Sequence, residues 1–495
     1  MDPEPIAQQR WLRGPVAILI IFLVAIATRA VTFGNPLVDM DDQFYWLVGR
    51  SMWQGDWPIL DIWDRKPVGL FLLYGAIAGI DRSILAVQLA ATLFAAGTAA
   101  LIRAAALRIA SPRASLLAAV TYLLMLPLFW GQSGQSPVFY NLFMAGAGLI
   151  LLAASNLTDI AAIRRHAFLA MTLCGIALVI KQVSVAEGAF FGLTFLYLLH
   201  RLGERTSRII GTAAAMVAIA LSPTIIGIAL FTIRGDDAVL AYVQASYLSI
   251  FAKTAGANQS ALAGIGYLLL FGGPALLAAT IGALAVPENS INRLTHRLAV
   301  LWAAAAAAGY MLIPNFFPHY ALPMFVPLSI LAARAYDRRI GTPLFFALAA
   351  CCLISGRLTD LNDNRRAASD FGRIASTIET ARHGGCLYVA NGPVGLYAAV
   401  PACRLTTYLF PYHLTLATEA TSIGVDQRAE IAGIFAARPA VVVTQDDKRG
   451  KQSAAVRATL DRELMAHYQP VAGYPADAAE EIQTLRIWQR RDLVR

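Results

Sequence analysis

Residues Asn35–Leu73 read NPLVDMDDQFYWLVGRSMWQGDWPILDIWDRKPVGLFLL and decide how the rest of the chain is interpreted. They follow the first hydrophobic segment directly, yet they contain six aspartates, three bases and four tryptophans. Charged groups this close to a bilayer are costly unless they have a function, and tryptophan rings prefer the membrane surface. We therefore expect this segment to lie along the membrane surface as a catalytic loop.

Composition places the chain among polytopic membrane proteins. Its 495 residues are 57% hydrophobic and only 14% charged, with a mean hydropathy of +0.57, whereas a soluble protein carries about a quarter charged residues. The formal net charge is +9, but the bases cluster between apolar segments. That pattern sets orientation in a membrane and does not form a nucleic-acid-binding face. We expect membrane lipids, and no nucleic acid, among the partners.

Apolar runs of the usual span length predict about eleven transmembrane helices. They cover residues 15–33, 83–101, 116–130, 138–154, 168–180, 185–199, 209–233, 262–286, 298–313, 322–335 and 342–355. Every second turn is rich in arginine, as is the segment before the first span, so the positive-inside rule places these turns and the N-terminus in the cytoplasm. The acidic loop, the turn GQSGQSP at 131–137 and the C-terminal tail then share the outer side. The shorter apolar run 67–80 is interpreted as an interfacial or partly inserted helix.

The composition changes to that of a soluble domain near residue 358. Residues 386–390 (CLYVA), 440–444 (AVVVT) and 482–488 are typical of short strands, with helical segments at 367–381 and 427–437 between them. Alternating strands and helices predict a small α/β domain with a partly parallel sheet. We therefore divide the chain into a transmembrane domain, 1–357, whose outer loop 34–66 is catalytic, and a soluble domain, 358–495. No nucleotide-binding or nucleophile motif marks the second domain as catalytic, so a support or acceptor-docking role is expected.

Three acids open the loop where the chain leaves the bilayer: Asp39, Asp41 and Asp42. One interpretation is a solvated helix cap, because aspartate commonly starts helices. The other is a general base whose acidic neighbours raise its pKa. The rarity of charge at this depth favours the second interpretation.

Two bases, Arg65 and Lys66, directly precede the apolar run 67–80 on the outer side. Such a pair often contacts lipid headgroups only. A fixed pair is also suited to a phosphate on a lipid tail, because arginine offers a bidentate fork and lysine a point charge. Arg50 is either a third member of this phosphate site or the partner of an acid in the loop.

Two later positions are further candidates for the phosphate. Lys181 ends a predicted outward span, where the helix dipole favours a cation and where lysine also snorkels. His319, in the segment FFPHY at 316–320, is either structural or a phosphate or metal ligand. The chain has no HExxH or comparable ligand spacing, so no cofactor is evident, and a divalent metal stays an alternative that the ligand spacing does not support.

Five cysteines are present, of which Cys386 and Cys403 lie in the tail. In an oxidising compartment these two would form a disulfide. Metal binding is less supported, because no CxxC or nearby histidine cluster accompanies them. The other three cysteines lie in apolar runs and are expected to be small buried side chains.

The loop resembles the first outer loop of GT-C membrane glycosyltransferases. Residues 41–57 (DDQFYWLVGRSMWQGDW) and 64–75 (DRKPVGLFLLYG) are similar to the dolichyl-phosphate-mannose-protein mannosyltransferase-like group, which includes the aminoarabinose transferase acting on lipid A. The matching positions are Asp41, Asp42, Tyr45, Arg50, Gly55, Asp56, Trp57, Lys66 and Pro67. GIALVIKQ at 175–182 and FFPHYALPMFVPL at 316–328 resemble two later segments of that family.

The resemblance implies a GT-C fold, a polyprenyl-phosphate sugar as donor and a lipid, glycan or protein acceptor. Asp41 would be the general base of an inverting transfer, with Asp42 and Asp39 beside it. Lys66 and Arg65 would stabilise the departing lipid phosphate, with Arg50, Lys181 and His319 as further ligands. Tyr45, Tyr320 and Gln135 would line the sugar or acceptor pocket.

Two departures from the family pattern bear on the chemistry that it implies. Val68 replaces the second proline of a KPP motif. Gln135 and Ser136 stand where some relatives carry an acid, which argues against a carboxylate-held metal.

The family also implies a location in the bacterial inner membrane, with the C-terminal domain in the periplasm and a role in lipopolysaccharide, surface-polysaccharide or protein glycosylation. The alternative is a transporter or flippase. Transporters tend to show repeated halves and broken helices with polar groups near the midplane. Here the polar candidates gather at one face and no repeat is visible, so a glycosyltransferase is favoured.

Overall fold

The structure is a computed structural model that describes residues 14–249, 251–252, 260–312, 316–445, 452–478 and 481–494. The chain divides into two compact units. The helical unit comprises Met1–Phe33, Gln88–Gly227 and Ala257–Leu361, and the mixed unit comprises Gly34–Val87, Ile228–Gly256 and Asn362–Arg495. Each unit is described by itself.

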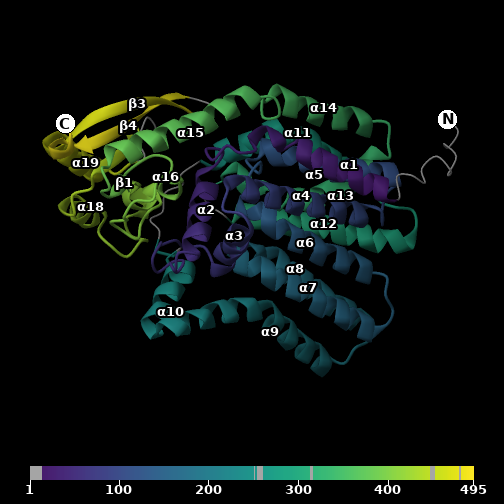
Figure 1. Ribbon diagram of the computed structural model, residues 1–495. Coiled ribbons are helices and arrows are strands. Elements are labelled where there is room, and N and C mark those ends of the chain that lie inside the picture. Colours follow the sequence, from purple (N-terminus) through teal and green to yellow (C-terminus); the bar gives the residue numbers. More distant parts are fainter. Residues whose placement is uncertain are drawn as a thin grey trace. The chain divides into compact units, whose positions relative to one another are not determined.

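The described residues contain a helix for each of the eleven predicted spans. They are α1 (Pro15–Ala27), α4 (Ile84–Ala106), α5 (Pro112–Leu128), α6 (Ser136–Ala154), α7 (Ile160–Ile180), α8 (Val185–Arg201), α9 (Thr206–Leu230), α11 (Ala261–Leu284), α12 (Ser290–Met311), α13 (Phe325–Tyr336) and α14 (Gly341–Ile354) (Figure 1). Seven segments among the described residues are long and apolar enough to cross a membrane, and shorter apolar helices accompany them. The polytopic helical class is confirmed, whereas the count of eleven crossings stays a prediction.

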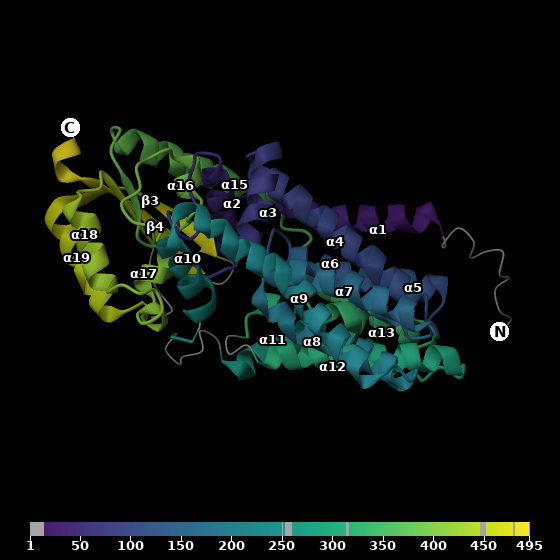
Figure 2. The ribbon, with the colours of Figure 1, turned by 90° about the horizontal axis from the view of Figure 1, so that it is seen from below.

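Small residues let helices of the helical unit approach closely. Helix α6 packs on α7, and α11 packs on α13; Figure 2 shows this bundle from below. In α11, a Cβ atom added at Gly282 would lie 1.9 Å from the carbonyl oxygen of Leu331 in α13. Only glycine fits at this crossing, as is typical of helix interfaces in membranes, where close backbone contact replaces the hydrophobic effect.

A fully buried arginine holds the turn between α5 and α6. Arg29, just after α1, is 0% exposed. Its Nε donates to Thr92 Oγ1 at 3.2 Å, and its two terminal nitrogens donate to the carbonyls of Gly131 and Ser133. The guanidinium thus satisfies backbone acceptors of the 131–137 turn, and burying this charge is tolerable because each of its three nitrogens has an acceptor.

The mixed unit begins with two helices that the charged loop connects. Helix α2 (Met40–Met52) packs on α3 (Val68–Ile80), so the apolar run after Lys66 forms the short helix expected of it. Most of α2 is buried. The segment around α10 (Asp236–Val243) belongs to the same unit, where Phe231 stacks on Tyr242 with ring centroids 4.2 Å apart and Trp57 packs edge-on against Phe231.

The tail of the mixed unit carries a small four-stranded sheet of order β1-β2-β4-β3. Strands β1, β3 and β4 are labelled in Figure 1. Strand β1 (Leu387–Val389) is parallel to β2 (Val441–Gln445), while β4 (Glu481–Arg490) is antiparallel to β2 and to β3 (Tyr468–Ala478). The expected partly parallel sheet is confirmed. Strand β3 was not predicted from the sequence. It contains two prolines and a glycine, residues that a strand tolerates at an edge.

Helices cover this sheet and complete its core. They are α15 (Leu361–Ala381), α18 (Gln427–Ala436) and α19 (Ala454–His467), with the short helices α16 (Leu396–Ala399) and α17 (Pro411–Thr415) between the strands. Helices α18 and α19 pack against each other (Figure 2). The core contains Tyr388, Ile431, Val442 and Leu460, all nearly inaccessible to solvent.

The charged loop and the tail are joined by specific contacts inside the mixed unit. The amide N–H of Gly395 donates to Gln43 Oε1 at 3.1 Å, and the N–H of Trp63 donates to the carbonyl of Thr407 at 2.9 Å. Arg404 forms an ion pair with Asp56. The loop, predicted as part of the transmembrane domain, therefore folds together with residues 362–495.

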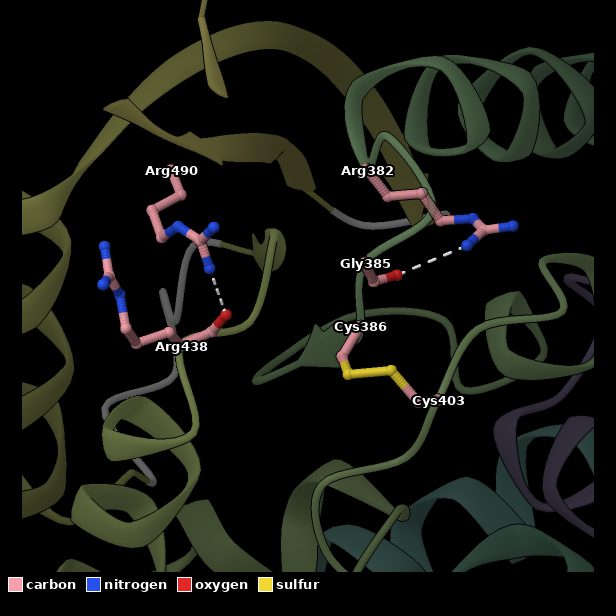
Figure 3. The surroundings of a disulfide bond; sticks show 6 residues. All are labelled: Arg382, Gly385, Cys386, Cys403, Arg438 and Arg490. Carbon is pink, nitrogen blue, oxygen red and sulfur yellow. Dashed lines mark hydrogen bonds between the residues drawn. A yellow bond between two sulfur atoms is a disulfide. The ribbon is translucent and has the colours of Figure 1, made fainter. Parts of the chain in front are cut away.

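A disulfide closes a short loop at the start of the sheet. Cys386, next to β1, bonds to Cys403 with their Cα atoms 4.7 Å apart (Figure 3). Beside it, the guanidinium of Arg382 donates to the carbonyl of Gly385 at 3.3 Å, and Arg490 donates to the carbonyl of Arg438. This is the pairing that the sequence analysis proposed for an oxidising compartment.

We expect the double variant Cys386→Ser/Cys403→Ser to lose stability. A cross-link over 17 positions constrains the unfolded chain, and its removal costs about 3 kcal/mol by the chain-entropy relation. Chemical unfolding of the full chain measures the loss, with Cys351→Ser, a replacement of an unbonded cysteine, as the matched control. Two free thiols in non-reducing mass spectrometry of the native protein would contradict the pairing.

Candidate functional site

The predicted site residues fall into two groups, one in each unit. The mixed unit contains the acids at 39–42, Tyr45, Arg50 and the basic pair. The helical unit contains Gln135, Lys181, His319 and Tyr320.

The acidic run forms the N-terminus of α2. Asp39 is its N-cap, and its carboxylate accepts the amide N–H groups of Asp41 at 2.8 Å and Asp42 at 3.4 Å. Asp39 thus fits the helix-cap interpretation. Asp42 is 1% exposed, whereas Asp41 is half-buried, and both benefit from the positive end of the helix dipole. Asp39 is half-buried as well, but its carboxylate caps the helix, so Asp41 is the candidate base among the three.

Tyr45 lies one helical turn beyond Asp41, on the same face of α2. It is 0% exposed, and its hydroxyl has no hydrogen-bond partner among the described residues. Burial raises its pKa well above 10, and the charges of Asp41 and Asp64 raise it further. Tyr45 therefore stays neutral and keeps its proton. The ammonium of Lys66 lies 5.4 Å from the centre of its ring, so one aromatic side chain adjoins both the acids and the base.

The basic pair at the end of the loop has two different environments. Arg65 forms an ion pair with Glu419, donates to Ser422 Oγ at 3.1 Å and lies 5.6 Å above the ring of Trp63. Lys66 Nζ lies 3.4 Å from both carboxylate oxygens of Asp64. Both are suited to neutralising an anion, but Arg65 is already paired by the tail.

Arg50 lies at the other end of α2 from the acids. It occupies the last turn of the helix, 5.1 Å over the ring of Trp46. Nine residues at 1.5 Å per residue separate it from Asp41 by about 14 Å along the axis. Helix α2 thus carries Arg50 away from the acids at its first turn.

The second group gathers around Tyr320 in the helical unit. Lys181, at the C-cap of α7, places its ammonium 5.4 Å over the Tyr320 ring. His319 is 6% exposed and lies 4.4 Å from the same ring, and Phe317 stacks on the imidazole. The structure thus brings Lys181, His319 and Tyr320 together. Gln135 occupies the N-cap position of α6 and is 1% exposed.

Beside this group lies a buried carboxyl that spacing alone did not single out. Glu187, in the first turn of α8, is 4% exposed and accepts the indole N–H of Trp302 in α12. It lines a cavity of about 10 Å³, together with Tyr140 and Tyr320, which is room for a single water molecule. A carboxyl at membrane depth marks a functional position by default.

Three further polar residues of the site came from the structure. Asp64, His413 and Glu419 surround the basic pair, and each is at most 5% exposed. Asp64 was already visible in the sequence as one of the loop acids. Nothing in the sequence near His413 or Glu419 indicates that His413 contacts Asp64 or that Glu419 contacts Arg65. Among the described residues no group of histidine, cysteine, aspartate and glutamate side chains has the arrangement of a metal site.

Solved structures match this fold over nearly its whole length. ArnT from Cupriavidus metallidurans bound to undecaprenyl phosphate matches with a TM-score of 0.67 at 15% identity, over 97% of this chain and 100% of that one. The archaeal oligosaccharyltransferase AglB from Archaeoglobus fulgidus, in complex with an inhibitory peptide and a dolichol-phosphate, matches with a TM-score of 0.54 at 11% identity, over 96% and 80%. No protein-family model and no curated protein matches the sequence. At these identities the match concerns the fold, and it confirms the fold that the loop motifs predicted.

Proposed function

We propose that this chain, which has the fold of the GT-C membrane glycosyltransferases, transfers a sugar from a polyprenyl-phosphate-linked donor to a hydroxyl acceptor. One observation carries the proposal: an acid, Asp41, and a base, Lys66, both adjoin Tyr45 in one compact unit. An acid for the acceptor and a cation for the phosphate are the two groups that such a transfer needs.

On the acceptor side, Asp41 is the general base. As the acceptor oxygen attacks the anomeric carbon, its proton passes to the Asp41 carboxylate, and the new glycosidic bond forms with inversion. Asp42 and Asp39 surround the base with negative charge, and neighbouring acids favour the protonated form of one another. Tyr45 remains a neutral hydrogen-bond donor to substrate oxygens, and Tyr320 and Gln135 are proposed as further pocket residues.

On the donor side, the bond between the anomeric carbon and the phosphate oxygen breaks, and its electron pair leaves with the lipid phosphate. Lys66 stabilises this charge, and a fixed cation lowers the barrier most when it lies where negative charge develops in the transition state. The bound lipid phosphates of ArnT and AglB support such a donor. Arg65, which is paired with Glu419, is proposed as a further contributor, as are Lys181, His319 and Arg50. A single phosphate as leaving group needs no metal in this scheme.

The site is proposed to face the periplasm of a bacterial inner membrane. The arginine-rich turns assign the N-terminus to the cytoplasm, which leaves the charged loop and the tail on the outer side. The disulfide between Cys386 and Cys403 supports an oxidising compartment. Acceptors on that side are lipid A or lipopolysaccharide, a surface polysaccharide or a protein.

Reconstitution with a mixture of acceptors tests the function. The full chain in liposomes receives radiolabelled polyprenyl-phosphate sugars together with a membrane extract as the acceptor source. We expect free polyprenyl phosphate to be released and label to enter an acceptor, also in the presence of EDTA. Movement of labelled lipid across the bilayer without a new glycosidic bond would instead establish a flippase and contradict the proposal.

A further inference from the structure

The tail of the mixed unit supplies two buried polar side chains to the segment that carries Lys66. Glu419 contacts Arg65, and His413 lies against Asp64, with 4.0 Å between its Nε2 and Asp64 Oδ1. About 350 positions separate each of these pairs in sequence. Burial of ionised groups is costly. A soluble domain with only a support role would therefore have no need to bury charge beside Lys66.

Arg65 is paired with side chains of the tail. Its guanidinium makes two contacts with the Glu419 carboxylate and one with Ser422, and its central carbon lies 5.6 Å from the centre of the Trp63 ring. The two terminal nitrogens of the guanidinium thus form the fork that suits a carboxylate, while its buried Nε has no hydrogen-bond partner among the described residues. Of two adjacent bases, one is thus neutralised by the tail, while Lys66 remains beside Asp64.

Asp64 lies at the centre of the cluster. It is 1% exposed, and its Oδ1 accepts the amide N–H of Arg65 at 2.6 Å, which fixes the carboxylate relative to the backbone. Both of its oxygens lie 3.4 Å from Lys66 Nζ. Lysine has a flexible four-carbon stem, so a fixed carboxylate at this distance restricts where the ammonium can lie.

His413 closes the other side of Asp64. The imidazole is 5% exposed, packs edge-on against Trp63 at 4.7 Å and lies 5.1 Å from Phe410. Neither ring nitrogen has a hydrogen-bond partner among the residues that the structure describes. Burial lowers the pKa of His413 to about 3, against the opposing effect of Asp64. The ring is therefore uncharged at neutral pH and does not compete with Lys66 for the carboxylate.

We propose that Asp64 is a positioning residue for the Lys66 ammonium, and that the uncharged ring of His413, with its Nε2 4.0 Å from Asp64 Oδ1, confines the carboxylate by packing beside it. The C-terminal domain thereby becomes part of the donor-phosphate site. This inference rests on the proposed function, because it assigns a task to the lysine that binds the lipid phosphate. It also makes a directional prediction. If Asp64 only neutralised Lys66, its removal would strengthen phosphate binding. If Asp64 positions Lys66, its removal weakens phosphate binding.

Donor kinetics of the full chain in liposomes test the inference. We expect Asp64→Asn to raise the donor KM about 10-fold or more, because small displacements of a binding group are expensive, and to leave the acceptor KM unchanged. His413→Gln is also expected to raise the donor KM. The double variant Asp64→Asn/His413→Gln is expected to have the same donor KM as Asp64→Asn alone, because His413 acts only through Asp64. Inhibition by undecaprenyl phosphate weakens in parallel.

Matched controls separate positioning from folding. His467→Gln replaces an exposed histidine that lies 4.0 Å from Glu463, and Glu430→Gln replaces a partly buried tail carboxylate that accepts from Thr406. Both are expected to keep the wild-type donor KM. Asp64→Glu retains the charge but displaces it by one methylene, and it still raises the donor KM if position matters, even where Asp64→Asn fails to fold.

Two results overturn the inference alone. The first applies if the wild type is active and its donor KM depends on Lys66: a donor KM for Asp64→Asn or Asp64→Glu that equals the wild-type value or falls below it. The other is full additivity of the Asp64 and His413 substitutions. A wild-type chain that transfers no sugar from any polyprenyl-phosphate donor overturns the proposed function, and the inference with it.

Discussion

Asp41→Asn is expected to reduce the turnover number for sugar transfer by about two to four orders of magnitude, the range that a positioned general base contributes. Asparagine has nearly the same shape, so the first turn of α2 is retained. The Asp39 cap accepts backbone N–H groups of residues 41 and 42, and these do not depend on the side chain at 41. The variant removes the proton acceptor and little else.

The measurement is initial-rate transfer from a polyprenyl-phosphate sugar, with the amount of folded protein checked by thermal unfolding in detergent. Asp237→Asn is the matched control, because Asp237 is also an acid in the first turn of a helix of the mixed unit, α10, and is exposed. We expect the control to retain full activity. Undiminished transfer by Asp41→Asn would reject Asp41 as the base and direct attention to Asp42, while leaving the glycosyltransferase class untouched.

The helices of the helical unit were predictable because a bilayer imposes a simple rule on sequence. Each span must be apolar for about 20 residues, and the basic turns between spans stand out against that background. The predicted ends of the spans were less accurate where polar groups are buried. Arg29 lies at the end of the first predicted span and would normally mark a membrane edge, yet it is fully buried and bonded to the carbonyls of 131 and 133.

The candidate site was predictable only where its residues are near one another in sequence. The Asp39 cap follows from the local preference of aspartate for helix N-termini, and the pair at 65 and 66 is visible as a charge cluster. The contacts of Arg65 with Glu419, and of Asp64 with His413, carry no local signal, because they join segments about 350 positions apart. Such contacts follow from the packing of the tail on the loop, which hydrophobic periodicity does not specify.

Strand β3 shows a second limit of the sequence. Its prolines and glycine argue against a strand under the usual propensities, but only β4 pairs with it among the described strands, and an edge strand tolerates missing donors. The strand pairs through a register shift between Pro470 and Ala472. Tertiary position therefore overrides the local preference, and that position is known only once the sheet order is known.

Lys66→Ala is expected to raise the donor KM by about 10-fold to 100-fold, since a hydrogen bond to a charged group contributes about 1.5–3 kcal/mol and about 1.4 kcal/mol is a factor of ten. Turnover falls as well, because the lysine neutralises charge that develops as the phosphate departs. The loss has a second component. Without Lys66, the buried Asp64 carboxylate loses a partner at 3.4 Å, and breaking a buried pair costs about 3–5 kcal/mol of stability.

A double variant separates these two components. Lys66→Met/Asp64→Asn removes both charges and keeps similar volumes, so it is expected to unfold near the wild-type temperature, as neutral replacements of buried pairs often do. Its donor KM is nevertheless expected to remain as high as that of Lys66→Ala, because the phosphate still lacks its cation. Lys66→Arg is expected to recover only part of the donor affinity, since a planar fork does not reproduce a compact ammonium held against Asp64. Wild-type donor kinetics in the double variant would show that Lys66 serves only to neutralise Asp64, and the donor phosphate would then have to be bound by other cations, with Lys181 and His319 the next to be replaced.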